Sequence, residues 1–373
     1  MGTLEKLISQ LCPDGVEYKP LGEVCKIEKG VQLNRETLKE EGAYPVINGG
    51  INPSGFWDEY NYEAHKITIS QGGASAGYVN WMSSRFWAGA HCFVLDKPSP
   101  GVVYRYLFYV VKASEHDLMQ SQIGAGIPSV STAKLSSVSV PLPTLSVQKE
   151  IVRMLDDMAG LIDALEEELA ARKKQYEWCR ERLLENKYGC NVVTIRDIAT
   201  VARGKVISKD YLKDHAGDYP VYSSQTLNNG EFGRIDTYDF EGEYLTWTTD
   251  GANAGSVFYR NGKFSITNVC GLIRVTDKSV DTRYLHYALK EEAIKYVSPG
   301  MGNAKLMSNV MLGISLSLPP LSEQRRIVKI LDSFDTLCNS MTEGLPGEIA
   351  LRKQQYEHYR DKLLAFKRKP EVA

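Results

Sequence analysis

The sequence lacks paired cysteines, long apolar runs and an excess of charge of either sign. Its seven cysteines occur singly, without a Cys-x-x-Cys pair, which argues against a zinc site or a disulfide framework and favours reduced packing thiols. No apolar run approaches the roughly 20 residues that span a bilayer, and the first residues lack the apolar stretch of a signal peptide. We therefore expect a cytoplasmic protein with no membrane partner.

Recognisable catalytic motifs are also missing. Gly72 and Gly77 have the glycine spacing of a phosphate-binding loop, but Tyr78 occupies the position where that loop requires lysine. The six histidines are isolated, and none has the helical spacing of metal ligands. The Asn-Pro-Pro-aromatic run of amino-methyltransferases does not occur. The sequence therefore predicts no catalytic residue and no metal site on this chain, and indicates a binding protein.

What the sequence does contain is an internal repeat. LSVQKEIVRMLD (145–156) returns as LSEQRRIVKILD (321–332) with seven of twelve positions identical, and RKKQYEWCRERLL (172–184) returns as RKQQYEHYRDKLL (352–364) with eight of thirteen. Shorter echoes follow in the same order: YPVING (44–49) with YPVYSS (219–224), GGASAG (72–77) with DGANAG (250–255), and YRYLFYVVK (104–112) with TRYLHYALK (282–290). Each half is therefore one globular module followed by one long helix.

Apolar residues in both long segments recur at alternating spacings of four and three, the heptad pattern of a helix that packs against another helix. The first seam begins Ile151, Leu155, Met158, Ile162, Leu165 and Leu169, and the second begins Ile327, Leu331, Phe334, Cys338 and Met341. The offset between the copies grows from 176 to 180 residues across TEGLPGE (342–348), where Gly344, Pro346 and Gly347 predict a kink. Ser146 and Ser322 are placed to cap the first turns.

Two such helices, each roughly 40 residues and about 60 Å long, most simply pair with each other, and antiparallel pairing fits because each follows a module. We predict an α+β fold of two strand-rich α/β globular modules separated by a pair of long antiparallel coiled-coil helices, with an internal pseudo-twofold repeat. The predicted boundaries are 1–146 for the N-terminal segment and first module, 147–190 for the central helix, 191–321 for the second module and 322–373 for the C-terminal helix.

The alternative is that the heptads form an intramolecular core and nothing more. If the seam is buried, Leu165→Glu should cost several kcal/mol.

Inside the modules, KITISQGGASAGYVNW (66–81) and EYLTWTTDGANAGSVFYR (243–260) are each typical of a strand, a glycine-containing turn and a second strand. The repeated YRYLFYVVK and TRYLHYALK segments have helical spacing. The glycines are explained as turn formers, although such a turn also lets a polar loop approach another molecule closely.

Two variable modules, each followed by a Leu-Ser-x-Gln…Leu-Asp helix and each containing the YPV, Gly-x-x-x-Gly and Arg-Tyr-Leu echoes, closely resemble the specificity subunit of type I restriction-modification systems over essentially the whole chain. The resemblance implies that the modules are target recognition domains, each reading one half of a bipartite, asymmetric sequence in double-stranded DNA. It implies that the helices act as a ruler and dock two methyltransferase (modification) subunits, and that restriction subunits join the assembly. It also implies that AdoMet, ATP and magnesium belong to those partners, with no cofactor and no catalysis on this chain.

A DNA-reading role needs polar side chains for base edges and Lys or Arg for phosphates, gathered on one face because the net charge is only −2. The candidates in the first module are Lys29, Gln32, Asn34, Arg35, Asn48, Asn52, Gln71, Ser75, Asn80 and Arg85. The candidates in the second module are Arg203, Lys205, Lys209, Ser223, Ser224, Gln225, Asn228, Thr248, Thr249, Asn253 and Arg260. The alternative for any one of them is a solvated loop residue. Because the two sets differ, we expect two different half-sites.

Partner contacts are predicted at helix residues that recur in both copies, which are Gln148, Arg172, Gln175 and Tyr176 with Gln324, Arg352, Gln355 and Tyr356. For the arginines and tyrosines, the alternative is that they fill the seam. A second hypothesis for the whole protein is a coiled-coil adaptor whose modules bind proteins or glycans, which predicts no salt-dependent DNA binding. A third is an enzyme with an unfamiliar site, for which no nucleophile and base can be identified.

Overall fold

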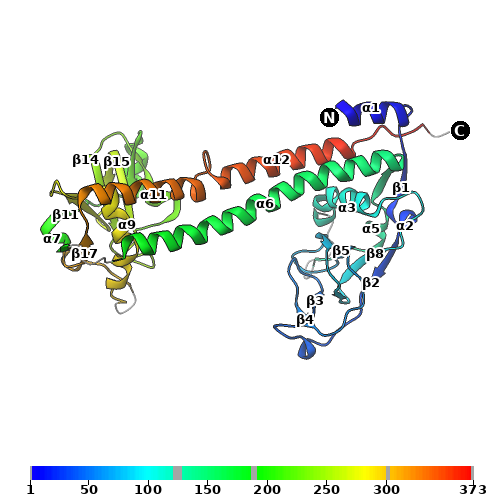
Figure 1. Cartoon of the computed structure of the whole chain (residues 1–373), viewed down its shortest axis with the longest axis horizontal. Coiled ribbons are helices and arrows are strands. Elements are labelled where there is room, and N and C mark those ends of the chain that lie inside the picture. Colours follow the sequence, from blue (N-terminus) through cyan, green and yellow to red (C-terminus); the bar gives the residue numbers. More distant parts are fainter. Residues whose placement is uncertain (1, 121–127, 186–190, 300–302, 371–373) are drawn as a thin grey trace. The chain divides into compact units, whose positions relative to one another are not determined.

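The computed structural model of the chain divides into two compact units (Figure 1). The first unit contains residues 1–166 and 349–373, and the second contains residues 167–348. The residues that the structure describes are 2–120, 128–185, 191–299 and 303–370. Each unit combines a sheet-rich module with helical segments, so the predicted α+β class with two strand-rich modules and long helices is confirmed.

The module of the first unit is built on a four-stranded antiparallel sheet of order β2-β8-β5-β6, a three-stranded sheet of order β4-β3-β7 and a two-stranded sheet of β1 and β9. Its strands are β1 (Glu17–Pro20), β2 (Lys26–Lys29), β3 (Tyr44–Ile47), β4 (Gly55–Trp57), β5 (Lys66–Ser70), β6 (Val79–Met82), β7 (Trp87–Ala88), β8 (Cys92–Asp96) and β9 (Ser139–Leu142). Its helices are α1 (Gly2–Leu11), α2 (Leu21–Val24), η1 (Arg35–Thr37), α3 (Tyr104–Ala113), α4 (Glu115–Gln120) and α5 (Thr132–Ser136).

The module of the second unit has a six-stranded sheet of order β11-β16-β14-β15-β12-β13 and a two-stranded sheet of β10 and β17. Its strands are β10 (Asn191–Thr194), β11 (Ala199–Arg203), β12 (Tyr219–Tyr222), β13 (Glu231–Ile235), β14 (Phe240–Thr248), β15 (Val257–Ile266), β16 (Cys270–Val275) and β17 (Ser315–Leu318). Its helices are α7 (Ile195–Ile198), α8 (Lys209–Asp214), η2 (Leu227–Gly230), α9 (Thr282–Glu292), η3 (Ala293–Tyr296) and α10 (Ser308–Leu312).

The two modules repeat one topology. The order β2-β8-β5-β6 corresponds to β11-β16-β14-β15, and the parallel pair β3–β7 corresponds to the parallel pairing of β12 with the end of β15. Both predicted strand–turn–strand segments are confirmed as the antiparallel pairs β5–β6 and β14–β15, and both predicted Arg-Tyr-Leu helices are confirmed as α3 and α9. The echo in the sequence therefore reflects a duplicated fold.

The turn glycines in these hairpins are needed for close packing. Gly77 has φ +95°, and a Cβ there would lie 2.8 Å from the backbone nitrogen of Met119. Gly255 has φ +87°, and a Cβ there would lie 2.7 Å from the side chain of Val297. A side chain at either position would therefore both strain the backbone and clash, which supports the turn-forming explanation of the repeated glycines.

The long helices are α6 (Leu145–Leu184), α11 (Leu321–Asn339) and α12 (Leu345–Leu364). The second copy is interrupted between α11 and α12, where the sequence predicts a kink. A Cβ on Gly344 would lie 2.3 Å from the carbonyl oxygen of Thr336, so only glycine fits there. Met341 lies in this break and is 64% exposed, so its predicted place in the heptad seam is wrong. Among the described residues, no helix is long and apolar enough to cross a membrane.

Antiparallel pairing of the helices is seen within each unit. In the first unit, Lys353 of α12 forms a 2.6 Å ion pair with Glu166 of α6, while Leu363 joins the core that contains Leu155. In the second unit, the ring of Tyr176 on α6 stacks on Phe334 of α11 at 5.8 Å. Residue numbers fall along α6 as they rise along its neighbour, which is the antiparallel pairing expected because each helix follows a module.

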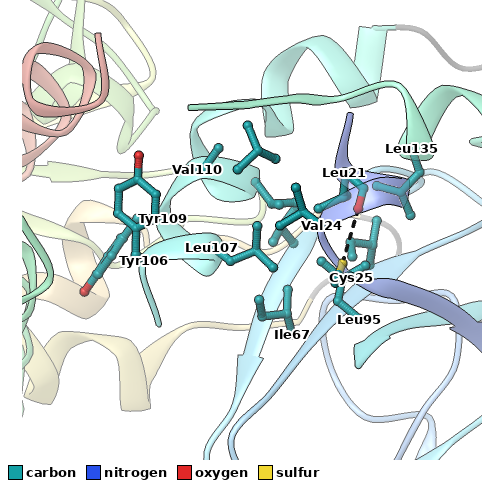
Figure 2. Packing of buried hydrophobic residues seen from close by; sticks show 14 of the residues in the cluster. Leu21, Val24, Cys25, Ile67, Leu95, Tyr106, Leu107, Tyr109, Val110 and Leu135 are labelled. Atoms are coloured by element: carbon teal, nitrogen blue, oxygen red, sulfur yellow. Dashed lines mark hydrogen bonds between the residues drawn. The ribbon is translucent and has the colours of Figure 1, made fainter. Parts of the chain in front are cut away.

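The core of the first unit joins the module to the helix that follows it. Figure 2 shows Leu107 and Val110 of α3 directed toward Leu21 and Val24 of α2, with Ile67 and Leu95 of the sheet beneath them. The same cluster contains Val147, Ile151 and Leu155 at the start of α6. The second unit has a corresponding cluster under α9, and a separate one where α11 meets Tyr284 and Tyr287. Each module is therefore fixed to its helix by buried apolar area.

Candidate nucleic-acid interface

In the second unit, three strand ends bring Arg203, Thr249 and Asn268 together. Arg203 ends β11, and its Nη1 donates to the Thr249 hydroxyl and, at 3.2 Å, to the carbonyl oxygen of Asn268. Thr249 directly follows β14, and Asn268 lies in the turn between β15 and β16. The order β11-β16-β14-β15 explains this meeting, because all three positions lie at one end of the same sheet.

The loop after β12 joins this cluster. The Ser224 hydroxyl donates to the carbonyl oxygen of Asp250 at 2.5 Å, and the Thr267 hydroxyl donates to Ser223 at 2.9 Å. Gln225 closes the loop by donating from Nε2 to the carbonyl oxygen of Glu231. The structure thus brings Arg203, Ser223, Ser224, Gln225 and Thr249 to one place, as expected for a binding surface made of several loops.

Basic groups surround these polar residues. Lys205 forms a β-bridge with Thr267, and its ammonium lies 2.7 Å from Asp239, a hydrogen bond that raises the pKa of Lys205. Lys305, which the sequence reasoning missed, forms a backbone β-bridge with Asp250. Its ammonium lies 3.9 Å from the Asp250 carboxylate. With Arg203 they supply three cations at one end of the sheet, the kind of group that contacts phosphates.

Three predicted readers of the second module are buried, and their predicted contact with DNA is wrong for this structure. Thr248 and Thr249 are fully buried, and their hydroxyls donate to the carbonyl oxygens of Asn253 and Val269. Arg260 is 3% exposed and stacks on the ring of Tyr222 at 3.5 Å. The local sequence pattern predicted exposed polar residues. The burial of these three side chains comes from pairing with strands that are far away in the sequence.

Arg260 instead holds the loop that contains Asn228 and Asn229. Its Nη2 donates to the carbonyl oxygen of Asn229 at 2.8 Å, and its Nε donates to Thr246 at 3.0 Å. Burial lowers the pKa of Arg260 to about 10, which leaves the guanidinium charged at neutral pH. Asn228 and Asn229 both have positive φ, of 49° and 52°, a conformation that costs free energy for residues other than glycine. Arg260 helps to hold this strained loop in place.

The remaining candidates of the second module are exposed. Lys209 begins α8, Asn228 lies in η2, and Asn253 lies in the turn between β14 and β15. The hydrogen bond from Thr248 goes to the backbone oxygen of Asn253 and does not involve its side-chain amide.

The first unit repeats the same framework with other side chains. Lys29 ends β2 as Arg203 ends β11. Each is followed by a glycine that packs closely against a neighbouring segment, and a Cβ on Gly30 would lie 2.2 Å from the carbonyl oxygen of Ala88. The backbone nitrogen of Gln71 donates to the carbonyl oxygen of His91, whose own nitrogen donates to the side chain of Asn48 at 3.0 Å. Lys29, Asn48 and Gln71 therefore lie at the matching end of the first sheet, together with His91.

The other candidates of the first module are more scattered. Ser75 lies in the β5–β6 turn, and its carbonyl oxygen accepts from the backbone nitrogen of Tyr78. Gln32, Asn34 and Asn52 are exposed in the loops before and after β3. Arg35 begins η1, but its side chain lies outside the described parts of the chain.

Asn80 and Arg85 are engaged elsewhere. Asn80 lies within β6, and its side-chain oxygen accepts from the backbone nitrogen of Trp81. Arg85 pairs with Glu63 at 2.7 Å and stacks over the ring of Tyr60. Both side chains are therefore engaged within the module, and their contact with DNA stays a prediction.

Of the predicted partner residues, Gln148 and Gln324 are fully buried, and their predicted contact with another subunit is wrong. Gln148 accepts from the Val103 nitrogen and donates to the carbonyl oxygens of Gly101 and Pro143. Gln324 repeats this with Asp281, Ser279 and Pro319. Ser322 lies inside the first turn of α11, whose N-cap position is Pro320 without a side-chain cap, so its expected capping role is wrong.

The other helix candidates are divided between the seam and the surface. Tyr176 is buried in the seam, and Tyr356 packs against the core of the first unit, as the alternative reading expected. Arg172 donates to Gln175 at 2.9 Å, and Arg352 donates to Gln355 at 3.1 Å. These two Arg–Gln pairs remain as candidates for a partner surface.

Sequence reasoning missed a polar junction that ties each module to its helix. Arg283 of α9 donates from Nε to Asp332 of α11 at 2.8 Å, and Tyr287 donates to the same oxygen at 2.5 Å. Burial, followed by this hydrogen bond, raises the pKa of Tyr287. In the first unit, Arg105 and Tyr109 make the same contacts with Asp156. The signal was present, because these are the repeated letters of the Arg-Tyr-Leu and Leu-Asp echoes.

Replacing Asp332 with asparagine should destabilise the second unit by about 1–2 kcal/mol, because Arg283 is half-buried and would lose its charged partner. Asp156→Asn should have a similar effect in the first unit. Urea denaturation followed by circular dichroism measures both, and Asp163→Asn, at an exposed position of α6 outside the junction, is the control. Equal stability of all three variants would contradict a structural role of the junction.

The chain resembles known proteins along most of its length. The sequence profile of the type I restriction modification DNA specificity domain matches it twice, over residues 13–172 and 188–351. A Haemophilus influenzae protein named as a type I restriction enzyme specificity subunit is 30% identical over 97% of this chain and 98% of its own length. A Mycoplasma pneumoniae protein named as a type I specificity subunit is 41% identical over 63% of this chain and 89% of its own length.

Solved structures agree at the level of the fold. The crystal structure of a type I restriction-modification S subunit from M. genitalium superposes with a TM-score of 0.68 and 16% identity, covering 96% of this chain and 97% of the other. The relatives are named as specificity subunits, which agrees with the recognition role that the sequence predicts for this chain. The chain belongs to the family of type I restriction-modification DNA specificity proteins.

Proposed function

We propose that the chain reads a bipartite sequence in double-stranded DNA, with one part contacted by the loops of each unit. The observation that supports this is one loop framework in both modules that carries different polar groups. Lys29 and Arg203 occupy equivalent strand ends, whereas Ser75 in the turn of the first unit corresponds to Asn253 in the turn of the second. A shared cation suits phosphate, which is the same in every sequence, and the differing groups suit base edges, which are not.

We further propose that the long helices dock two methyltransferase subunits and that restriction subunits join this assembly. The repeated Arg172–Gln175 and Arg352–Gln355 pairs support two equivalent contact surfaces. AdoMet, ATP and magnesium would then be bound by those partners. Among the described residues, no group of histidine, cysteine and acidic side chains could hold a metal ion. A DNA-reading role would place the protein in the cytoplasm, where the DNA is.

Exchanging residues 20–140 for the corresponding module of a relative tests the proposal. The chimera, in complex with methyltransferase subunits, is expected to change one half of the methylated sequence and to leave the other half unaltered. Mapping of methylated adenines by sequencing measures this, and the unexchanged chain is the control. A change in both halves would argue against modular reading.

The proposal also predicts how binding responds to salt. DNA binding by the complex should weaken steeply as salt rises, because each phosphate contact releases counterions. A gel-shift titration that shows no salt-dependent binding would favour the protein- or glycan-binding adaptor.

A further inference from the structure

Asp250 is an acidic residue at the centre of the candidate interface of the second unit. It follows Thr249 after β14, and it meets the ends of two other segments. Its backbone oxygen accepts from Ser224, and its β-bridge joins it to Lys305. Its side chain is 23% exposed, so the carboxylate is partly open to solvent in the middle of a surface whose neighbours are basic.

The carboxylate has unused capacity to accept hydrogen bonds. Oδ2 lies 2.6 Å from the Thr249 hydroxyl, whose one proton is shared between this oxygen and the Val269 carbonyl, and 3.9 Å from Arg203. Oδ1 lies 3.9 Å from the Lys305 ammonium, which is beyond hydrogen-bond distance. An ionised carboxylate offers about four lone-pair positions and no donor. No hydrogen bond from the described residues reaches Oδ1, so this oxygen can accept one from an outside donor.

The loop does not need this carboxylate to keep its shape. Main-chain hydrogen bonds hold it, from Thr249 to Val269, from Gly251 to Ala304 and from Leu306 to Thr249. The first unit has the same three bonds, from Gln71 to His91, from Gly73 to Pro128 and from Val130 to Gln71. There the residue equivalent to Asp250 is Gly72, which has no side chain. The framework therefore forms with or without the acidic group.

A carboxylate on a DNA-binding surface repels phosphate, so it is unfavourable unless it meets a hydrogen-bond donor. In the major groove the donors are the exocyclic amino groups, N4 of cytosine and N6 of adenine, and Asp and Glu pair with the first of these. The neighbouring Arg203 and Lys305 offset the repulsion from the backbone.

We propose that Asp250 is a specificity-determining residue, whose Oδ1 accepts a hydrogen bond from the exocyclic amino group of one cytosine or adenine in the part of the target read by the second unit. This inference rests on the proposed DNA-reading function. Gly72 makes no such contact, so the first unit reads its part of the sequence without an acidic group at this position.

The test is methylation mapping on a randomised DNA library with the chain in complex with its methyltransferase subunits. Asp250→Gly, which copies the first unit, should relax the preference at one base pair of one half-site by roughly 10- to 100-fold and leave the other half unchanged. Asp250→Asn separates the two bases. Asparagine pairs with adenine through N6 and N7, so a preferred cytosine should give way to adenine, whereas a preferred adenine should be kept.

Asp277→Asn is the matched control, because it also removes one negative charge from the second unit. Asp277 follows the end of β16 that lies away from the candidate interface. It should leave every base preference unchanged. A uniform loss of methylation in Asp250→Gly with all preferences intact would overturn the inference, since Asp250 would then act only on affinity. If the unaltered complex shows no sequence preference at all, the proposed DNA-reading function itself fails.

Discussion

Replacing Gln148 with glutamate is expected to destabilise the first unit by roughly 3–5 kcal/mol at neutral pH, although the two side chains have nearly the same shape. The side chain of Gln148 is fully buried, and its amide nitrogen donates to the carbonyl oxygens of Gly101 and Pro143. A carboxylate cannot donate, so it would face two acceptors with a buried negative charge. Gln324→Glu should have the same effect in the second unit, because its contacts are equivalent.

The defect of Gln148→Glu should depend on pH in a defined direction. Burial raises the pKa of the introduced carboxyl in the folded chain above its unfolded value of about 4.3. The folded state then binds more protons, so stability is retained below about pH 4.3 and falls as the pH rises, by about 1.4 kcal/mol per pH unit until the folded pKa is reached.

Urea denaturation at pH 4 and pH 7 measures this prediction. Gln354→Glu, at an exposed position of α12, is the control and should change stability little at either pH. A Gln148→Glu protein that unfolds at the same urea concentration as the control at pH 7 would show that the buried amide contributes nothing.

The repeated helices and hairpins could be predicted because their signals are local. Heptad spacing identifies α6 and α11, and the insertion around Gly344 marks the break before α12. The roles of Gln148 and Arg260 could not be predicted in this way. The partners of Gln148 at Val103 and Gly101 lie more than forty residues away in the sequence, and the burial of Arg260 depends on the order of the strands.

The same limit applies to the candidate interface. Polar residues in loops predicted the general location, and Lys29, Gln71, Arg203 and Ser224 do lie at matching ends of the two sheets. Lys305 was missed because a β-bridge to Asp250, 55 residues earlier, brings it there. Individual base contacts stay a prediction, since they depend on DNA that the sequence does not describe.

The internal repeat gave a stronger signal than any single motif. Gln148 and Asp156 recur as Gln324 and Asp332, and each makes the same contacts in its own unit. Gln148 and Gln324 looked like parts of a partner surface when the sequence was read along the helix alone. They are instead the residues that join a module to a helix, which explains why both copies of the helix keep them while the loops differ.

Replacing Leu331 with glutamate should have an effect at least as large, about 4–5 kcal/mol. Leu331 is fully buried between Tyr176 of α6 and the α9 tyrosines. The substitution would place a side chain of different shape in this core and bury a charge without a partner. Leu165→Glu, for which the seam predicted a comparable cost, should cost under about 1 kcal/mol. Leu165 is only half-buried, and a longer side chain there can turn its carboxylate to water.

The two variants therefore measure where the helix seam is buried. Both place a glutamate at a predicted heptad position, and only the surroundings differ. Thermal unfolding followed by circular dichroism should show a large drop in midpoint for Leu331→Glu and a small one for Leu165→Glu. Equal drops would mean that α6 is covered along its whole length by a partner helix. Two small drops would mean that the packing of Tyr176, Leu331 and Phe334 adds little to stability, and the helix pairing in the second unit would have to be reconsidered.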